Sequence, residues 1–174
     1  MNISLPLTSL RSYVAHEFST LRTRALRDTF WAKLTGKNTK LDPFPEGTFQ
    51  KGPNRKSLGT MDIPVKEIIG TLYRHSDFDR QFRPLKRNLQ DRWVNIYLLQ
   101  QSEGFPPILV HKVGEHYYVE DGHHRVSVAR NMGILFIQAR VWEYPVQTKP
   151  ATKCENVECP TKKPLKKYAV SAAD

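Results

Sequence analysis

The chain of 174 residues has only two cysteines and no long apolar run. Two cysteines are too few for the disulfide framework that stabilises many small secreted proteins. The longest apolar stretches, such as residues 134–137, are far shorter than the roughly 18 residues that cross a bilayer, and residues 1–10 lack the pattern of a signal peptide. We therefore expect a cytoplasmic protein that has no membrane partner.

Acidic residues are also scarce, since 17 Asp and Glu face 27 Lys and Arg and leave a net charge of +10. The excess lies at the two ends, because residues 61–146 hold eleven basic and ten acidic side chains. A nucleic-acid surface needs several cations on one face, which a count along the chain does not establish. The excess of positive charge can therefore be explained either by a need for solubility or by a DNA partner, and both explanations stay open. The candidate DNA contacts are Arg22, Arg24, Arg27, Lys162, Lys163, Lys166 and Lys167.

The composition divides the chain into four parts. Residues 1–35 contain an amphipathic helix, predicted from Thr8 to Leu34, because apolar residues recur there every three or four positions. Residues 36–58 are rich in Pro, Gly and Asn, which predicts a linker or an ordered surface loop. The hydrophobic share of 39% is enough for one core, which we place in residues 59–146.

Residues 147–174 are rich in lysine and polar residues, which predicts a disordered tail. Its two cysteines, Cys154 and Cys159, supply two of the four ligands that structural zinc normally takes. Free thiols are the simplest interpretation. A redox disulfide and a zinc ion shared between two subunits stay open as alternatives.

The pattern within residues 59–146 predicts an α+β fold with a small mixed sheet and flanking helices. The expected elements are a strand over residues 60–65, a helical turn over 66–70, a helix over 84–101, a hairpin of 108–110 and 117–119, a helix over 123–132, and a strand over 135–142. Three tryptophans on apolar faces are expected to pack in the core: Trp31, Trp93 and Trp142.

A short polar motif, Asp121-Gly122-His123-His124-Arg125, connects the second hairpin strand to the helix that follows. A glycine there lets backbone N–H groups approach an anion, and the helix N-terminus adds a favourable dipole. His124 and Arg125 can add charge-assisted hydrogen bonds, and Asp121 can hold a nucleotide-bound magnesium ion or act as a base. The alternative interpretation is a plain turn, with Asp121 capping the helix and both histidines in solvent.

Two further groups of side chains are weaker candidates. Arg80 and Arg83 precede a predicted helix, where they either face bound phosphates or form a surface pair with Asp79. His111 and His116 flank the hairpin turn, but no cysteine or acidic spacing supports a metal site with them.

The runs Phe105–Val110 and Tyr118–Arg130 resemble the ParB/sulfiredoxin-like superfamily, specifically small bacterial ParB-like domain proteins. The resemblance covers about residues 59–144. It implies that the Gly-x-x-Arg turn, with Gly122, His123, His124 and Arg125, binds the phosphates of ATP, ADP or CTP together with Mg²⁺.

Departures from the better known members narrow the expected activity. Sulfiredoxins carry their reactive cysteine where this chain has His123, so we do not expect a sulfiredoxin-type reductase. Partition-type ParB proteins have a second nucleotide motif and a helix-turn-helix domain, neither of which follows Tyr144. The Asp-Gly-x-His-Arg form is more similar to the free serine kinases of the superfamily.

That similarity implies a nucleotide-dependent phosphotransferase or NTPase, with catalytic roles for Asp121 and for a second acidic residue. Glu67 is the candidate by position, and an exposed helix residue is the alternative interpretation. The other function that stays open is a non-enzymatic, DNA-associated module that uses the two basic ends. A homodimer is compatible with either function.

Overall fold

The computed structural model describes residues 7–45 and 55–145. They form an α+β fold with one six-stranded mixed sheet in the order β1-β3-β5-β4-β6-β2. The elements are α1 (Leu7–Leu34), β1 (Asp42–Pro43), β2 (Lys56–Pro64), η1 (Val65–Glu67), β3 (Ile68–Thr71), η2 (Arg87–Leu89), α2 (Gln90–Ser102), β4 (Ile108–Val113), β5 (His116–Asp121), α3 (His123–Asn131) and β6 (Phe136–Tyr144). The predicted fold class is therefore confirmed.

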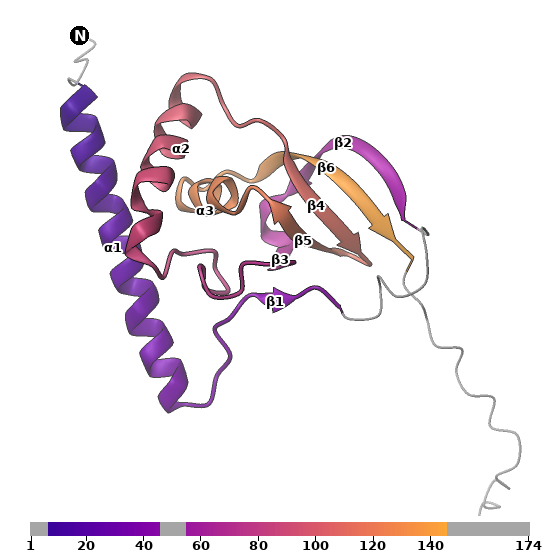
Figure 1. Ribbon diagram of the computed structural model, residues 1–174, viewed down its shortest axis with the longest axis horizontal. Helices are drawn as coiled ribbons and strands as arrows, with labels where there is room; N and C mark the ends of the chain where they lie inside the picture. Colours follow the sequence, from indigo (N-terminus) through magenta and orange to yellow (C-terminus); the bar gives the residue numbers. More distant parts are fainter. Residues whose placement is uncertain (1–6, 46–54, 146–174) are drawn as a thin grey trace, which may run out of the picture.

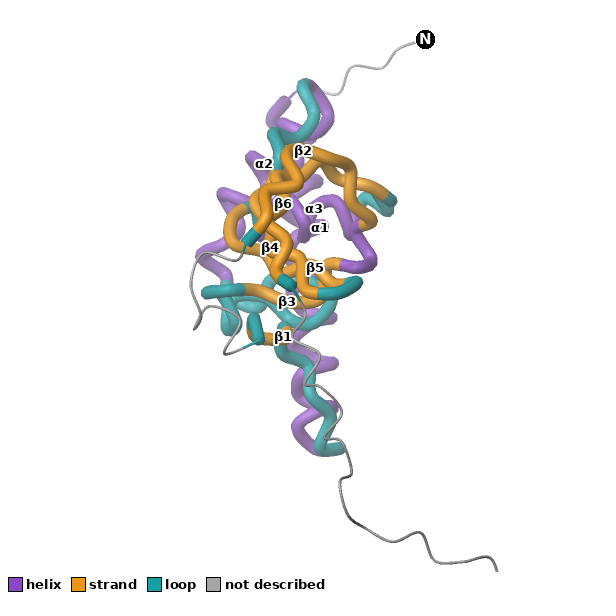
Figure 2. Tube along the Cα trace, turned by 90° about the vertical axis from the view of Figure 1, so that its right-hand side faces the viewer, coloured by secondary structure: helices purple, strands orange, loops and turns teal. Residues whose placement is uncertain are grey.

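The helices lie on one side of the sheet, with α3 closest to it, α2 next and α1 outermost (Figure 1). Figure 2 shows the sheet in front of the helices after a quarter turn of the view. The predicted N-terminal helix is α1, which buries Val14, Phe18 and Ala25 at helical spacing. Phe18 meets the fully buried Trp93 of α2 edge to face, with 5.7 Å between the ring centres. No helix of the described residues is long and apolar enough to cross a membrane.

β5 occupies the middle of the sheet and ends at the candidate site. It pairs with β3 in parallel and with β4 in antiparallel orientation, which confirms the predicted hairpin. β6 runs parallel to β4 and antiparallel to β2, which is an edge strand. Because β5 has a partner on both sides, its last residue and the start of α3 are fixed in position.

The described residues of the segment 36–58 contain strand residues and buried side chains, which is more than the predicted linker or ordered surface loop. β1 pairs with β3 in parallel, and the side chains of Leu41 and Phe44 on either side of it are buried. Phe44 packs against Tyr118 and Tyr144 on the sheet face away from the helices. β2 begins at Lys56, before the predicted start of the domain, and residues 46–54 lie outside the described residues.

Two predicted helical segments are shorter than expected. The turn over residues 66–70 is a 3₁₀ turn, η1, followed by strand β3. The helix predicted from Pro84 begins instead at η2 and α2. The Asp79 carboxylate accepts the backbone N–H groups of Gln81 and Arg83, so this segment folds as a loop before the helix can start.

The prediction of a core position fails for one tryptophan. Trp31 is 56% exposed near the end of α1, because the neighbouring helix covers a different side of this long helix. Trp93 is buried as predicted, and Trp142 is half-buried in the aromatic cluster around Phe44.

Candidate functional site

The junction between β5 and α3 is built on Gly122. Its backbone has a φ of 107°, in the left-handed region that favours glycine. A Cβ at this position would also collide with the side chain of Ile108, which is fully buried in β4. Two separate constraints therefore select glycine here, and together they set the position of the α3 N-terminus.

The two histidines of the motif are buried, which excludes the interpretation that both lie in solvent. His123 is 4% exposed, and its Nε2 lies 2.6 Å from the Thr71 hydroxyl oxygen. The ring of Phe78 stacks on His123 and meets the His124 ring edge to face. The first turn of α3 is thus held between strand β3 and the loop that follows β3.

Both histidines are neutral near pH 7. Burial lowers the pKa of His123 to about 4, and the charge of Arg74 adds to this effect. Burial also lowers the pKa of His124 to about 4, with smaller effects from Arg92 and Arg74. The Nδ1 atom of His124 is buried and has no hydrogen-bond partner within the described part of the chain. An unpartnered buried polar atom is costly, and the described residues do not supply the partner that this nitrogen lacks.

Arg125 is largely committed to the protein itself. One of its terminal nitrogens, Nη1, donates to the carbonyl oxygens of Pro106 and Pro107 at 2.9 and 2.7 Å. The other, Nη2, pairs with the Asp121 carboxylate at 2.5 Å. The Asp121 side chain is 63% exposed. Arg125 therefore anchors the turn to the segment before β4, and only its remaining N–H groups are available to a ligand.

Two arginines that the sequence analysis did not single out face the same turn. A small hollow at the start of α3 is lined by Arg74, Arg92, Ile96 and residues 121–125, and we call it the turn hollow. Arg92 belongs to α2, is exposed, and forms no ion pair with the described residues. Arg74 follows β3 and pairs with Asp77 at 3.0 Å. No motif connects these positions in the sequence, because three different segments bring them together.

The other predicted site residues lie elsewhere. Arg83 pairs with Asp79 and Asp28 at 2.6 and 2.8 Å and is mostly buried between them. Arg80 is exposed and lies 3.5 Å from the Asp42 carboxylate. Neither arginine lines the turn hollow, and Arg83 forms the pair with Asp79 that was the alternative interpretation.

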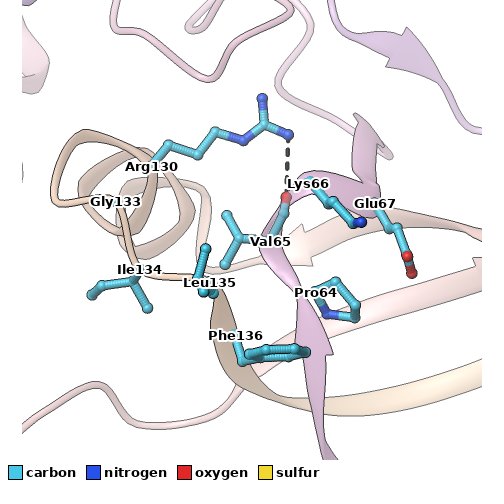
Figure 3. A pocket seen from close by; sticks show the side chains of 9 residues that line it. All are labelled: Pro64, Val65, Lys66, Glu67, Arg130, Gly133, Ile134, Leu135 and Phe136. Carbon is cyan, nitrogen blue, oxygen red and sulfur yellow. Dashed lines mark hydrogen bonds between the residues drawn. The ribbon is translucent and has the colours of Figure 1, made fainter.

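Glu67 lies in a separate pocket of about 590 Å³ beyond the other end of α3. Its neighbours there are mainly apolar: Pro64, Val65, Ile134, Leu135 and Phe136. Figure 3 shows the Glu67 carboxylate pointing away from Arg130, whose guanidinium donates to the Val65 carbonyl oxygen. The structure therefore does not bring Glu67 together with the turn.

The remaining candidates from the sequence have structural partners or lie outside the described residues. His111 is buried between the Glu120 carboxylate and the Tyr144 hydroxyl, and His116 is exposed. The described residues contain no group of three or more His, Cys, Asp or Glu side chains that could hold a metal ion. Cys154, Cys159, Lys162, Lys163, Lys166 and Lys167 lie outside the described residues.

The basic residues of α1 differ in what they contact. Arg22 donates from Nε to the Leu85 carbonyl oxygen at 3.0 Å and is half-buried. Arg24 and Arg27 are exposed, and Arg27 lies 3.5 Å from the neighbouring Asp28 carboxylate. Of the three arginines proposed as DNA contacts, Arg22 therefore has a structural role.

We predict that Gly122→Ala lowers the free energy of unfolding by about 2–4 kcal/mol, since the left-handed conformation and the collision with Ile108 both oppose a side chain. Gly133→Ala is the matched control, because Gly133 has a φ of 71° but a Cβ added there would meet nothing within 4 Å. It should cost only about 1 kcal/mol. Urea unfolding of both variants tests the difference, and equal losses would contradict it.

We also predict that acid destabilises the protein through the two buried histidines. Their pKa values are about 4 in the folded state and 6.5 in an ordinary environment, so the unfolded chain binds more protons between these values. The free energy of unfolding should therefore fall as the pH drops from 6.5 to 4, by up to about 1.4 kcal/mol per pH unit for each histidine.

His124→Gln should make this pH dependence shallower, whereas His116→Gln changes an exposed histidine and should leave it unaltered. Urea unfolding at several pH values within this window provides the measurement. The pKa of Asp77, which has hydrogen bonds from Lys86 and Arg74, is lowered from 3.8, so this carboxylate also loses stabilising effect below about pH 5, at the acid end of the window. Parallel curves for the wild type and His124→Gln would refute the assignment.

The comparisons with known proteins show a distant likeness to a solved structure. No family model matches the sequence, and no curated protein matches it. Among solved structures, the chain is similar to sulfiredoxin from Arabidopsis thaliana, with 21% sequence identity and a TM-score of 0.39. The match covers 49% of this chain and 86% of that chain. The likeness is distant in both sequence and fold.

Proposed function

We propose that the protein binds a nucleotide and that the phosphates contact the turn between β5 and α3. The observation that carries the proposal is the turn hollow itself. Arg74 and Arg92 line it from two other segments, and so does the buried His124, whose Nδ1 atom has no hydrogen-bond partner within the described residues. Anionic oxygens are the groups that such a set of donors and cations would bind.

The start of α3 adds to this preference for an anion. The first N–H groups of a helix have no acceptor within the helix, and the helix dipole favours negative charge there. Gly122 allows a ligand to approach the backbone closely because it has no side chain. The neutral His124 can donate through Nδ1 when its proton is on that nitrogen. The nearby carboxylates, Asp121 and Asp77, are paired with arginines.

The size of the turn hollow requires a rearrangement on binding. Its volume is about 30 Å³, which is the space of one water molecule. A phosphate group needs more room. Because the side chains of Arg74 and Arg92 are exposed, we expect them to move outward to admit the ligand. Once the ligand is bound, they can close over it.

A magnesium ion would reach this site on the nucleotide. Asp121 is the exposed carboxylate at the turn, and one of its oxygens is engaged by Arg125. The other oxygen can contact a phosphate-bound ion, which usually takes one or two carboxylates from the protein.

Binding is the core of the proposal, and phosphoryl transfer or nucleotide hydrolysis is a finer hypothesis within it. Such chemistry requires a group that positions or activates the nucleophile. Glu67 lies in the separate apolar pocket, so Asp121 is the remaining acidic candidate at the turn. ATP, ADP and CTP stay the candidate nucleotides.

We predict that Arg92→Ala weakens nucleotide binding at least tenfold, because a hydrogen bond to a charged group contributes about 1.5–3 kcal/mol. Calorimetric titration with ATP, ADP and CTP in the presence of Mg²⁺ measures the affinity. Arg92 is a cleaner test than Arg125, whose removal would also release the segment before β4.

Arg87→Ala is the matched control, because Arg87 is exposed in η2 five positions earlier and does not line the turn hollow. Its affinity should equal that of the wild type. The proposal fails if none of the three nucleotides binds, or if both variants lose affinity equally.

A further inference from the structure

A second basic pocket lies between α1 and the C-terminal half of α3, and we call it the arginine pocket. It has a volume of about 420 Å³ and is lined by Leu21, Arg24, Gln81, Arg83, Ser127, Arg130 and Asn131. None of these residues lines the turn hollow. The turn hollow lies at the first turn of α3, and this pocket is lined by residues from the second half of the same helix.

The three arginines of this pocket differ in how their charges are balanced. Arg83 is neutralised by Asp79 and Asp28. Arg130 donates to the backbone carbonyl oxygens of Val65 and Ile68 and forms no ion pair with the described residues. Carbonyl groups satisfy the N–H groups of Arg130 but leave its charge uncompensated.

Arg130 is also half-buried. Its guanidinium lies over the Phe82 ring, 4.9 Å from the ring centre. Burial lowers the pKa of Arg130, with an opposing effect from Asp79. Arg24 adds a second charge, since it is exposed and has no ion pair among the described residues. The arginine pocket therefore has an excess of positive charge, part of it in a region of low dielectric.

The neutral groups of the pocket can also donate hydrogen bonds. The Ser127 side chain is 1% exposed, and its oxygen accepts the Trp93 Nε1–H group at 3.0 Å. No acceptor for the Ser127 hydroxyl hydrogen is found within the described ranges, so this hydrogen is available to a ligand. The side-chain amides of Gln81 and Asn131 add further N–H groups.

We propose that the arginine pocket binds a small organic anion through a carboxylate or phosphate group. Three arginines line it, and the exposed guanidinium fork of Arg24 matches both kinds of oxyanion. Its volume lies within the range of 300–1,000 Å³ that is typical of small-molecule sites. Leu21 and Arg24 come from α1, so the site requires this helix to be docked. The proposal does not depend on nucleotide binding at the turn.

The test is a titration of the full-length, ¹⁵N-labelled chain followed by amide NMR spectra. Inorganic phosphate and acetate serve as separate probes, with sodium chloride at matched ionic strength as the reference. We expect saturable shifts of the Gln81, Ser127 and Asn131 amides with at least one probe. The probe that binds more tightly identifies the preferred head group. Shifts at residues 122–125 report binding at the turn separately.

Arg24→Glu should weaken the binding at least tenfold, because it replaces the exposed cation with an anion. Lys33→Glu is the matched control, since Lys33 is exposed on the same helix and lies nine positions further, on the opposite side. It should leave the affinity unchanged. The proposal is wrong if neither probe produces saturable shifts at the pocket, or if the two variants weaken binding equally.

Discussion

The left-handed conformation of Gly122, packed against Ile108, is the constraint on which the candidate site depends. It ends the central strand β5 and starts α3 within one residue, so the first helical turn enters the space between β3 and the following loop. There, Thr71 and Phe78 enclose the two histidines and keep them neutral. A rigid scaffold thus presents backbone donors at a fixed place, which is the arrangement that anion-binding turns use.

Around this scaffold, the arginines fall into two groups according to their partners. One group is committed to the protein through carbonyl oxygens or carboxylates and stabilises the loops next to α3. Its members are Arg83, Arg125 and Arg130. The other group is exposed at the rims of the two pockets and consists of Arg24 and Arg92, together with Arg74, which is exposed but also pairs with Asp77. The side chains that hold the loops in place therefore differ from those that the proposed sites expose to solvent.

The sequence was sufficient for the elements with a clear period or turn signal. The hairpin of β4 and β5, helix α3 and strand β6 were predicted because alternation, helical spacing and glycines mark them. β1 and β3 were missed because they have two and four residues, which are too few to show an alternating pattern in the sequence. Both strands form only through pairing with neighbouring strands. The motif around Gly122 was found, but Arg74 and Arg92 were not, since only tertiary packing brings them to it.

The most direct test of the account is the pKa of His124, measured by NMR titration with and without saturating nucleotide. The free protein should show a value of about 4, because the ring is buried beside arginines. Bound phosphates should raise it by about one unit or more, since a nearby opposite charge favours the protonated form. A pKa near 6.5 in the free protein would contradict the burial. A value that nucleotide leaves unchanged would contradict phosphate binding at the turn.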